Sequence, residues 1–385
     1  MRVALLTWDM PPRPTGLGRA ANEIARGLRS QGVEVTVFSA DRRGVETIEG
    51  LRIVGVSPET EGFLAHTREK ACRGHLVMPT AFSRAVAADG GSFDVVEATN
   101  WYAPGAFVQR TGLPLVVRCS TPAIDGLDPE GDERHRRDLQ FAHLLERRTV
   151  ARADARIFNT GPSAEKMKEV YELGERHGGT TIGLALDGDL IERGAAAPYP
   201  KNGPVRFVFI GRAERRKGFD EMLQAFALLC ERLDAAPELH LVGLSPCDLA
   251  DRVSHLSIPE RVVDLVHDHG RAADEEIDAL MGGAHAVLAP SRFESYGLVY
   301  REAAAWGRPC VMCAEDPSAS DFVRRVGSGT LAAECSPEAI ATAALEALER
   351  ATELRRNGLA HARNLDRATL GRRTLAVYEG VLRQR

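Results

Sequence analysis

Residues Ala286–Cys313 read AVLAPSRFESYGLVYREAAAWGRPCVMC. The short apolar runs at Ala286–Ala289 and Pro309–Cys313 are typical of strands that are buried on both faces of a parallel sheet. Between them, Ser295–Trp306 has the periodicity of a helix. A strand, a helix and a second strand in this order predict a βαβ unit with parallel strands.

The same alternation extends through the chain in both directions from this stretch. Upstream in the same half, we expect a helix at Asp220–Leu233 and strands at Val205–Ile210, Leu239–Gly243 and Val262–His267. In the N-terminal half we expect a helix at Ala20–Gln31, a helix opened by Ser163, and strands at Val3–Thr7, Val33–Phe38, Phe93–Glu97, Leu115–Arg118 and Ile157–Thr160. Between the halves, the small and Pro-rich segment Ala195–Pro204 suits an interdomain linker.

Two halves of similar size within 385 residues predict an α/β protein with two Rossmann-like domains. Each domain would contain a doubly wound parallel sheet, and the two would face each other across a cleft. We place the N-terminal domain at 1–194 and the C-terminal domain at 205–365. Because such sheets bind ligands at the carboxyl ends of their strands, the cleft is the expected active site.

The composition narrows the class of protein. The net charge is −5, so there is no global basic field to hold nucleic acid or an anionic membrane. The first apolar run is too short for a signal peptide, and no run approaches the ~18 apolar residues of a membrane span. Seven scattered cysteines suit a reducing cytoplasm, and the lone pair Cys310 and Cys313 is better explained as buried strand thiols than as a zinc site. We expect a cytoplasmic protein with no integral membrane segment, no nucleic-acid partner and no metal.

Gly16-Leu17-Gly18 lies between the first strand and the first helix. Glycines there let the backbone approach a ligand closely, and the helix N-terminus offers free N–H groups to an anion. With Ala21 and Asp41 further on, the segment also fits a loose nicotinamide-dinucleotide pattern. From these residues alone, a dinucleotide site and another kind of anion site both stay open.

The loop Gly211–Phe219, GRAERRKGF, follows another predicted strand. Arg212 comes at the end of that strand, and Lys217 precedes the next helix. Two cations beside a helix N-terminus suit a diphosphate, whose negative charge they neutralise as it departs. A solvated basic loop is the structural alternative, but its place directly after a strand favours the site.

Two carboxylates stand eight positions apart in the opening stretch. Glu294 falls in the loop and Glu302 on the following helix. Carboxylates suit sugar and ribose hydroxyls because they accept several hydrogen bonds, and the amides of Ser295–Leu298 would begin a helix that can hold a phosphate. Helix capping by Ser291 and Glu294 is the competing interpretation.

These three segments, in this order, resemble the retaining nucleotide-sugar glycosyltransferases of family 4, which have the GT-B fold. The paired Glu with seven residues between them, inside the frame Pro-Ser…Phe-Glu-x-x-Gly-Leu…Glu-Ala…Gly-x-Pro, is that family's signature. The resemblance covers nearly the whole chain. It extends to the C-terminal tail, which resembles a helix that packs back on the N-terminal domain at about 366–385.

The resemblance implies a role for each matching position. Arg212 and Lys217 would hold the donor diphosphate, which Gly16 and Gly18 would approach from the other domain. Glu294 would bind hydroxyls of the transferred sugar and Glu302 those of the ribose. Further donor contacts would come from Arg271, in the loop that faces the base, and from main-chain amides at Tyr296, Gly297, Leu298 and Val299. Arg212, Lys217 and Glu294 would be the catalytic set.

The chain departs from the family in two places. Where relatives often carry a His near the transferred sugar, this sequence has Ser120 and Thr121, either of which could hydrogen-bond the sugar or the acceptor. After Cys313, the usual Gly-Gly turn is replaced by Ala-Glu-Asp-Pro-Ser-Ala-Ser. Both changes hint at an unusual donor or acceptor.

Other polar residues are weaker candidates. Glu97 and Asn100 end a strand that would face the cleft, so they are acceptor-site candidates beside the alternative of loop capping. His66, Arg68 and Lys70 could line an acceptor loop. For His267 and His269 we predict no metal role, because no carboxylate completes a recognisable ligand set in the sequence.

The prediction is therefore a retaining, metal-independent hexosyltransferase that uses a UDP- or GDP-sugar as co-substrate, without a cofactor, and a small-molecule acceptor. The alternatives are an NAD(P)-dependent oxidoreductase, which leaves the two glutamates unexplained, and a non-catalytic sugar-nucleotide-binding protein. The donor sugar, its base, the acceptor, the type of bond formed and the oligomeric state are left open by the sequence.

Overall fold

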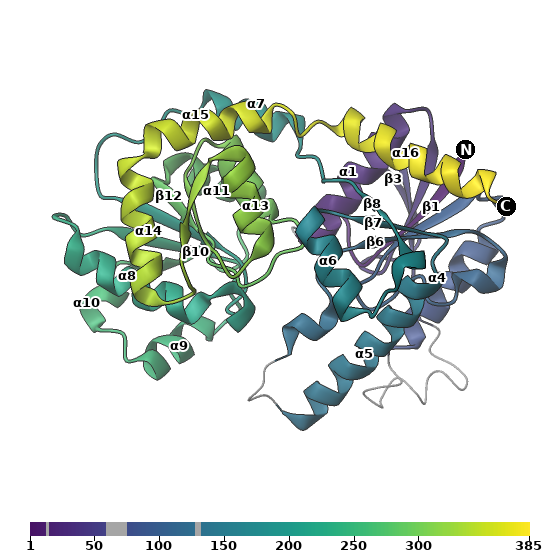
Figure 1. The fold of residues 1–385 in the computed structure, drawn as a ribbon, viewed down its shortest axis with the longest axis horizontal. Coiled ribbons are helices and arrows are strands. Elements are labelled where there is room, and N and C mark those ends of the chain that lie inside the picture. The colour runs from purple at the N-terminus through teal and green to yellow at the C-terminus, as the bar shows by residue number, and fades with distance from the viewer. Residues whose placement is uncertain (13–14, 59–74, 128–131) are drawn as a thin grey trace. The chain divides into compact units, whose positions relative to one another are not determined.

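The structure, a computed structural model, describes residues 1–12, 15–58, 75–127 and 132–385. They form two compact units, each drawn in Figure 1. The first comprises Met1–Ala185 together with Asp366–Arg385, and the second Leu186–Leu365. Each unit contains one sheet, so the predicted α/β class with two separate sheets is confirmed.

The first unit has an eight-stranded sheet of order β3-β4-β2-β1-β5-β6-β7-β8. All its pairings are parallel except that of β3 with β4. Its strands are β1 Arg2–Thr7, β2 Glu34–Ser39, β3 Val45–Ile48, β4 Leu51–Gly55, β5 Val95–Thr99, β6 Leu115–Cys119, β7 Ala155–Phe158 and β8 Thr180–Thr181. Its α-helices are α1 Gly16–Ser30, α4 Val77–Ala88, α5 Glu133–Arg152, α6 Gly161–Val170 and α16 Arg367–Arg383.

The second unit has a six-stranded sheet of order β11-β10-β9-β12-β13-β14, parallel throughout. Its strands are β9 Arg206–Ile210, β10 Glu238–Val242, β11 Val266–Asp268, β12 Ala286–Leu288, β13 Cys310–Cys313 and β14 Gly329–Ala332. Its α-helices are α7 Gly188–Ala196, α8 Phe219–Arg232, α9 Asp248–Leu256, α10 Glu260–Val263, α11 Asp274–Gly283, α12 Leu298–Ala305, α13 Pro317–Val326, α14 Pro337–Glu349 and α15 Ala351–Ala362.

Alternate residues of the second sheet enter two different cores. Phe207 and Phe209 of β9 pack with α8 and α14, whereas Val208 packs with α11, α12 and α13. Cys310 and Cys313 likewise belong to opposite cores, so the two thiols cannot bind one ion together. The sheet is thus covered on both faces, as its continuous apolar strands predict.

The C-terminal helix α16 belongs to the first unit and packs against α1 (Figure 1). The two helices cross at a pair of glycines. A Cβ on Gly27 would come within 2.7 Å of the Arg367 carbonyl oxygen, and one on Gly371 would overlap the Gly27 carbonyl. Nearby, the buried Glu23 accepts two hydrogen bonds from Arg367, at 2.7 and 2.8 Å.

Four predicted boundaries differ from the structure by more than two residues. The chain changes unit at Ala185 and not within Ala195–Pro204, because Arg355 and Arg308 donate to the carbonyls of Ala197 and Pro198 and tie this segment to the second unit. Helix α1 begins at Gly16, where Thr15 caps it. Helix α12 begins at Leu298, after Gly297 in the left-handed region. The predicted strand Val262–His267 is helix α10 up to Val263, and β11 starts only at Val266.

Candidate active site

The two segments singled out in the C-terminal half lie at one edge of the second sheet. β12 pairs in parallel with β9, so their carboxyl ends point the same way. The loop after β12 carries Glu294, and the loop after β9 carries Arg212 and Lys217. Backbone bonds join the two loops, since the Arg292 amide donates to the Arg216 carbonyl at 2.8 Å. The fold thus brings Glu294 and Lys217 together from 77 positions apart in the sequence.

Glu294 accepts several hydrogen bonds at a single carboxylate oxygen. Its Oε1 atom pairs with Lys217 Nζ, with Arg216 Nη1 at 3.2 Å and with Ser291 Oγ at 3.0 Å. The side chains of Glu294 and Lys217 are only 14% and 17% exposed. Ser291 therefore holds the Glu294 side chain and caps no helix, because the N-cap of α12 is Gly297.

The ionisation of Glu294 follows from these partners. Burial disfavours the charged carboxylate, but the Lys217 and Arg216 cations together with the hydrogen bonds outweigh this effect and lower its pKa to about 2. Glu294 is therefore a carboxylate near neutral pH, which suits an acceptor of hydroxyl hydrogen bonds and not a proton donor.

The loop that carries Lys217 depends on one glycine. Residues Arg215–Lys217 form a 3₁₀ turn that ends at Gly218, whose φ is +66°. A Cβ there would overlap the Pro290 carbonyl oxygen and approach Cys335 Sγ to 2.8 Å. Only glycine combines this conformation with such close contact between the two loops. Gly218 thereby fixes Lys217 against the loop that follows β12.

Arg216, which was not predicted, contacts Glu294, whereas Arg212 pairs with Glu214 instead. The Arg212 side chain is 67% exposed, and its Nη1 lies 2.7 Å from Glu214 Oε1. Arg216 lies inside, with its guanidinium donating to the Phe293 carbonyl at 2.9 Å as well as to Glu294. Sequence reasoning overlooked Arg216, although three consecutive basic residues, 215–217, could have raised it as a candidate.

The start of α12 is held by Arg301. Its guanidinium lies 3.6 Å from the centre of the Tyr296 ring and donates to the carbonyls of Tyr296 and Gly297. Leu298 and Val299 are the first two residues of α12 and are half-buried, whereas Glu302, one turn further on, is buried. The N-terminus of α12, at Leu298, lies four residues after Glu294 in the chain.

Asp316 replaces the expected glycine turn with a buried carboxylate. It caps α13 by accepting from the Ser318 amide at 3.0 Å, and it accepts from Tyr300 Oη at 2.9 Å. Burial and the nearby negative charge of Glu294 raise its pKa to about 6, against the effect of these hydrogen bonds. Sequence reasoning found the departure from the family here but not this role.

Three further donor candidates are Arg271 in the second unit and Gly16 and Gly18 in the first. Arg271 is exposed in the loop after β11, at the far edge of the sheet from β12. In the first unit, Gly16 is exposed and Gly18 is buried in the first turn of α1, where a Cβ on Gly18 would overlap the Asp9 carboxylate. Asp41, the acid of the dinucleotide pattern, is engaged by Arg42, Ser39 and the Met10 amide.

The acceptor candidates of the first unit fall into two groups. Glu97 is 1% exposed and is bonded to Arg118 Nε at 2.7 Å and Tyr378 Oη at 2.5 Å, so it fastens α16 to the sheet. Asn100 is fully buried and accepts from the Ser120 amide at 2.6 Å. This geometry favours structural roles for Glu97 and Asn100. Ser120 and Thr121 are half-buried and keep access to solvent.

A buried carboxylate that sequence reasoning missed fixes the loops around these residues. Glu146 of α5 accepts from the Tyr102 amide at 2.8 Å, the Ala123 amide at 3.2 Å and Tyr171 Oη at 2.8 Å. Burial raises its pKa to about 7, although these hydrogen bonds favour the charged form. Glu146 thus ties the loop after β5 to the loop after β6.

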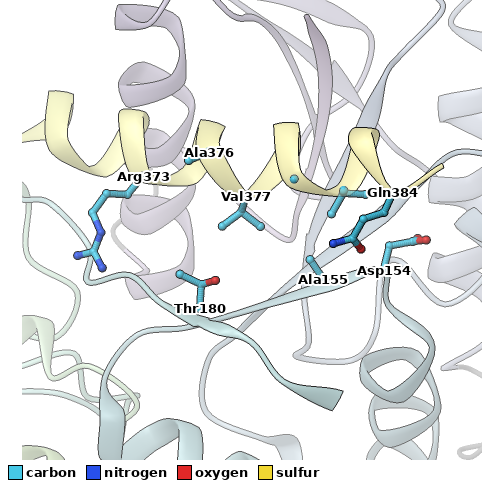
Figure 2. Close-up of a pocket in the computed structure, with 9 residues that line it drawn as sticks. Asp154, Ala155, Thr180, Arg373, Ala376, Val377 and Gln384 are labelled. Carbon is cyan, nitrogen blue, oxygen red and sulfur yellow. The ribbon is translucent and has the colours of Figure 1, made fainter. Parts of the chain in front are cut away.

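A cavity of about 440 Å³ lies in the first unit between α16 and the strands β7 and β8 (Figure 2). Arg373 and Val377 of α16, with Gln384 just after the helix, face Thr180 and Ala155 across it. None of the predicted site residues lines this cavity. His66, Arg68 and Lys70 lie outside the described residues. In the described part of the chain, no helix has the length and hydropathy needed to cross a bilayer.

Comparison with known proteins supports the interpretation of both units. Residues 196–364 match the family model of the glycosyl transferases group 1, and residues 15–175 match that of the glycosyl transferase 4-like domain. A D-inositol 3-phosphate glycosyltransferase of Catenulispora acidiphila is 30% identical over 400 residues, covering 95% of this chain and 91% of that protein. A glycogen synthase of Mycobacterium tuberculosis is 24% identical, covering 89% of this chain and 84% of that protein.

Solved structures confirm the predicted fold. Sucrose-phosphate synthase from Thermosynechococcus elongatus superposes with a TM-score of 0.76 at 20% identity, covering the whole of both chains. WaaG, a glycosyltransferase involved in lipopolysaccharide biosynthesis, gives a TM-score of 0.69 at 18% identity, covering 98% of this chain and all of that one. The two parallel-sheet units therefore have the GT-B fold.

Proposed function

Because this chain belongs to the glycosyl transferases group 1 family, we propose that it is a retaining, metal-independent hexosyltransferase. It would move a sugar from a UDP- or GDP-sugar to a small-molecule acceptor. The observation that carries this proposal is the cluster of Lys217, Arg216 and Glu294 at the carboxyl ends of β9 and β12. Cations beside a carboxylate at one sheet edge suit a diphosphate joined to a sugar.

In this proposal the second unit binds the donor. Lys217 and Arg216 hold the diphosphate, and the exposed Arg212 turns towards it from its contact with Glu214. Glu294 accepts hydrogen bonds from the sugar hydroxyls, and Glu302 accepts them from the ribose. The amides at the start of α12, from Tyr296 to Val299, support the sugar and a phosphate. Arg271 lies in the loop assigned to the base, and Gly16 and Gly18 approach the diphosphate from the first unit.

The proposed reaction takes place on one face of the sugar. The bond between the anomeric carbon and the diphosphate oxygen breaks, and the acceptor oxygen bonds to the same carbon from the same side. The acceptor proton passes to the departing diphosphate. Lys217 and Arg216 stabilise the negative charge that develops on the leaving group, which is the work that a metal ion does in other sites. The protein otherwise contributes positioning of the two substrates.

The first unit is proposed to bind the acceptor. Ser120 and Thr121, which stand where relatives often have a histidine, are half-buried hydroxyls fixed beside the Glu146 network. Hydroxyls can both donate to and accept from a polyol or a phosphate ester. The relatives named for inositol phosphate transfer make a phosphorylated polyol the first acceptor to test.

Release of nucleoside diphosphate tests the proposal. The purified chain is incubated with UDP- and GDP-hexoses, with and without inositol phosphates and other polyols, in the presence of a chelator. We expect diphosphate release that depends on an acceptor, together with a product that retains the anomeric configuration of the donor. Donor binding without release or transfer would favour the non-catalytic alternative. The family match gives no support to the NAD(P)-dependent oxidoreductase, for which NADH binding is the control.

A further inference from the structure

Three histidines gather at the edge of the second sheet, away from Glu294. His240 of β10 pairs in register with His267 of β11, the edge strand. Leu239 and Leu241 point into one core, so His240 and Glu238 lie on the other face of β10. The rings of His240 and His267 stack with centres 4.9 Å apart. Strand pairing thus supplies the carboxylate, Glu238, that the sequence around His267 and His269 lacks.

A chain of hydrogen bonds fixes the proton on His240. Glu276, in the first turn of α11, lies 2.8 Å from His269 Nδ1, and His269 Nε2 lies 3.0 Å from His240 Nδ1. A carboxylate only accepts, so Nδ1 of neutral His269 carries the hydrogen and its Nε2 accepts. The hydrogen between the two rings then belongs to His240 Nδ1. Nε2 of neutral His240 is therefore an unprotonated nitrogen with a free lone pair.

That lone pair faces another acceptor. His240 Nε2 lies 3.6 Å from Glu238 Oε2, too far for a hydrogen bond, and within the described residues this buried nitrogen has no hydrogen-bond partner. One ligand atom each from Glu238, His240 and His267 lies within 4.8 Å of the others. Two acceptors side by side without a proton between them are unfavourable unless a cation lies between them.

We propose that Glu238, His240 and His267 bind a divalent transition-metal ion of the zinc class, with solvent completing its coordination. Two ligands at the usual Zn–N and Zn–O distances of a tetrahedral site are about 3.4 Å apart, close to the separation of His240 Nε2 and Glu238 Oε2. His267 is exposed and can rotate to close the set. His269 and Glu276 supply the outer hydrogen bonds that orient a metal-binding imidazole.

The test measures metal binding and unfolding, so it does not depend on sugar transfer. The full chain, stripped with a chelator, is titrated with Zn²⁺ by calorimetry, and its thermal unfolding is followed with and without the ion. We expect one Zn²⁺ per chain and a higher unfolding temperature, since an ion that binds the folded state stabilises it. Mg²⁺ at the same concentration should do neither, because imidazole ligands favour transition metals.

Single substitutions test which side chains bind the ion. Glu238→Gln and His267→Ala should each weaken Zn²⁺ binding at least tenfold, and His269→Ala about 10–100-fold through the outer hydrogen bonds. The controls are His255→Ala, which removes an exposed histidine of α9, and Cys247→Ser, which removes an exposed thiol, and both should bind as the original chain does. His267 is exposed, so its variant should fold normally. The proposal is overturned if the chain takes up no Zn²⁺, or if Glu238→Gln and His267→Ala bind it unchanged.

Discussion

Two cations share one oxygen of Glu294, and the charges around them do not cancel. Arg212, Arg216 and Lys217 pair with the carboxylates of Glu214 and Glu294, so these five side chains together carry one net positive charge. That charge is available to a diphosphate. The nearby cations Lys217 and Arg216 also lower the pKa of Glu294, to about 2.

The variant Lys217→Ala tests the role of this net positive charge by removing one cation. Removing a cation that stabilises the leaving group should lower kcat/KM by roughly 10²–10³-fold. The free energy of unfolding should change far less, because Arg216 and Ser291 still hold Glu294. Lys201→Ala, at an exposed lysine, is the matched control and should leave both quantities unchanged. An active Lys217→Ala enzyme would remove the basis of the assignment.

Glu146 predicts a pH dependence of stability. Its pKa is raised to about 7 from an ordinary value of 4.5, so between these values the folded protein binds a proton that the unfolded chain does not. This contribution to stability is fully present below about pH 4.5 and is lost as the pH rises through 7, with an upper limit of ~3 kcal/mol.

Urea unfolding at several pH values compares the original chain with Glu146→Gln. The neutral amide does not titrate, so the variant should lack the decline between pH 4.5 and 7 that this carboxylate causes. If the two unfolding free energies decline in parallel over this range, the raised pKa of Glu146 is wrong.

The sequence singled out two residues that the fold brings together, Glu294 and Lys217, but not the contacts around them. Glu294 and Lys217 could be found because each follows an apolar strand at a fixed place in a βα loop. Arg216 was missed because the sequence does not show which of the consecutive basic residues 215–217 points towards Glu294. Glu146 was missed because a single carboxylate within a charged helix has no signature, and its burial depends on packing against the loops after β5 and β6.

At the scale of elements, α16 is attached to the first unit by close helix packing. Gly371→Ala would place a methyl group on the Gly27 carbonyl and force α1 and α16 apart. We expect a loss of about 1–3 kcal/mol in the free energy of unfolding, the usual cost of overpacking. Gly380→Ala is the control in the same helix. A Cβ there meets nothing within 4 Å, so it should be neutral or slightly stabilising. Equal stability of the two variants would contradict this packing.

Strands that form a continuous apolar run were predictable from the sequence, and a strand without such a run was not. β1, β6, β9 and β13 are buried over most of their length and stand out as apolar runs. β3 was missed because Val45–Ile48 is mostly exposed at the sheet edge. The predicted start of β11 was wrong because the mostly apolar stretch Val262–Val266, interrupted by Asp264, spans the end of one helix and the start of a strand. Periodicity alone cannot divide so short a run.

At the scale of the whole molecule, the two units divide the proposed work. The second contains the charged cluster at the carboxyl ends of β9 and β12, and the first contains the hydroxyls of Ser120 and Thr121 beside a rigid carboxylate network. The family and the GT-B fold follow from comparisons that span both units. Variants that test donor binding are therefore made at residues of the second unit, and they are studied in the full chain.

Calorimetric titration of the full chain with a nucleotide sugar and with its nucleoside diphosphate tests most directly whether Lys217 and Glu294 form the proposed diphosphate–sugar site. We expect a UDP- or GDP-sugar to bind at one site per chain and Lys217→Ala to weaken the binding of both ligands at least tenfold. Glu294→Gln should weaken the binding of the nucleotide sugar and leave that of the nucleoside diphosphate nearly unchanged, because the proposed contact of its carboxylate is with the sugar. Unchanged affinity of both variants for both ligands would show that these two residues do not form the site.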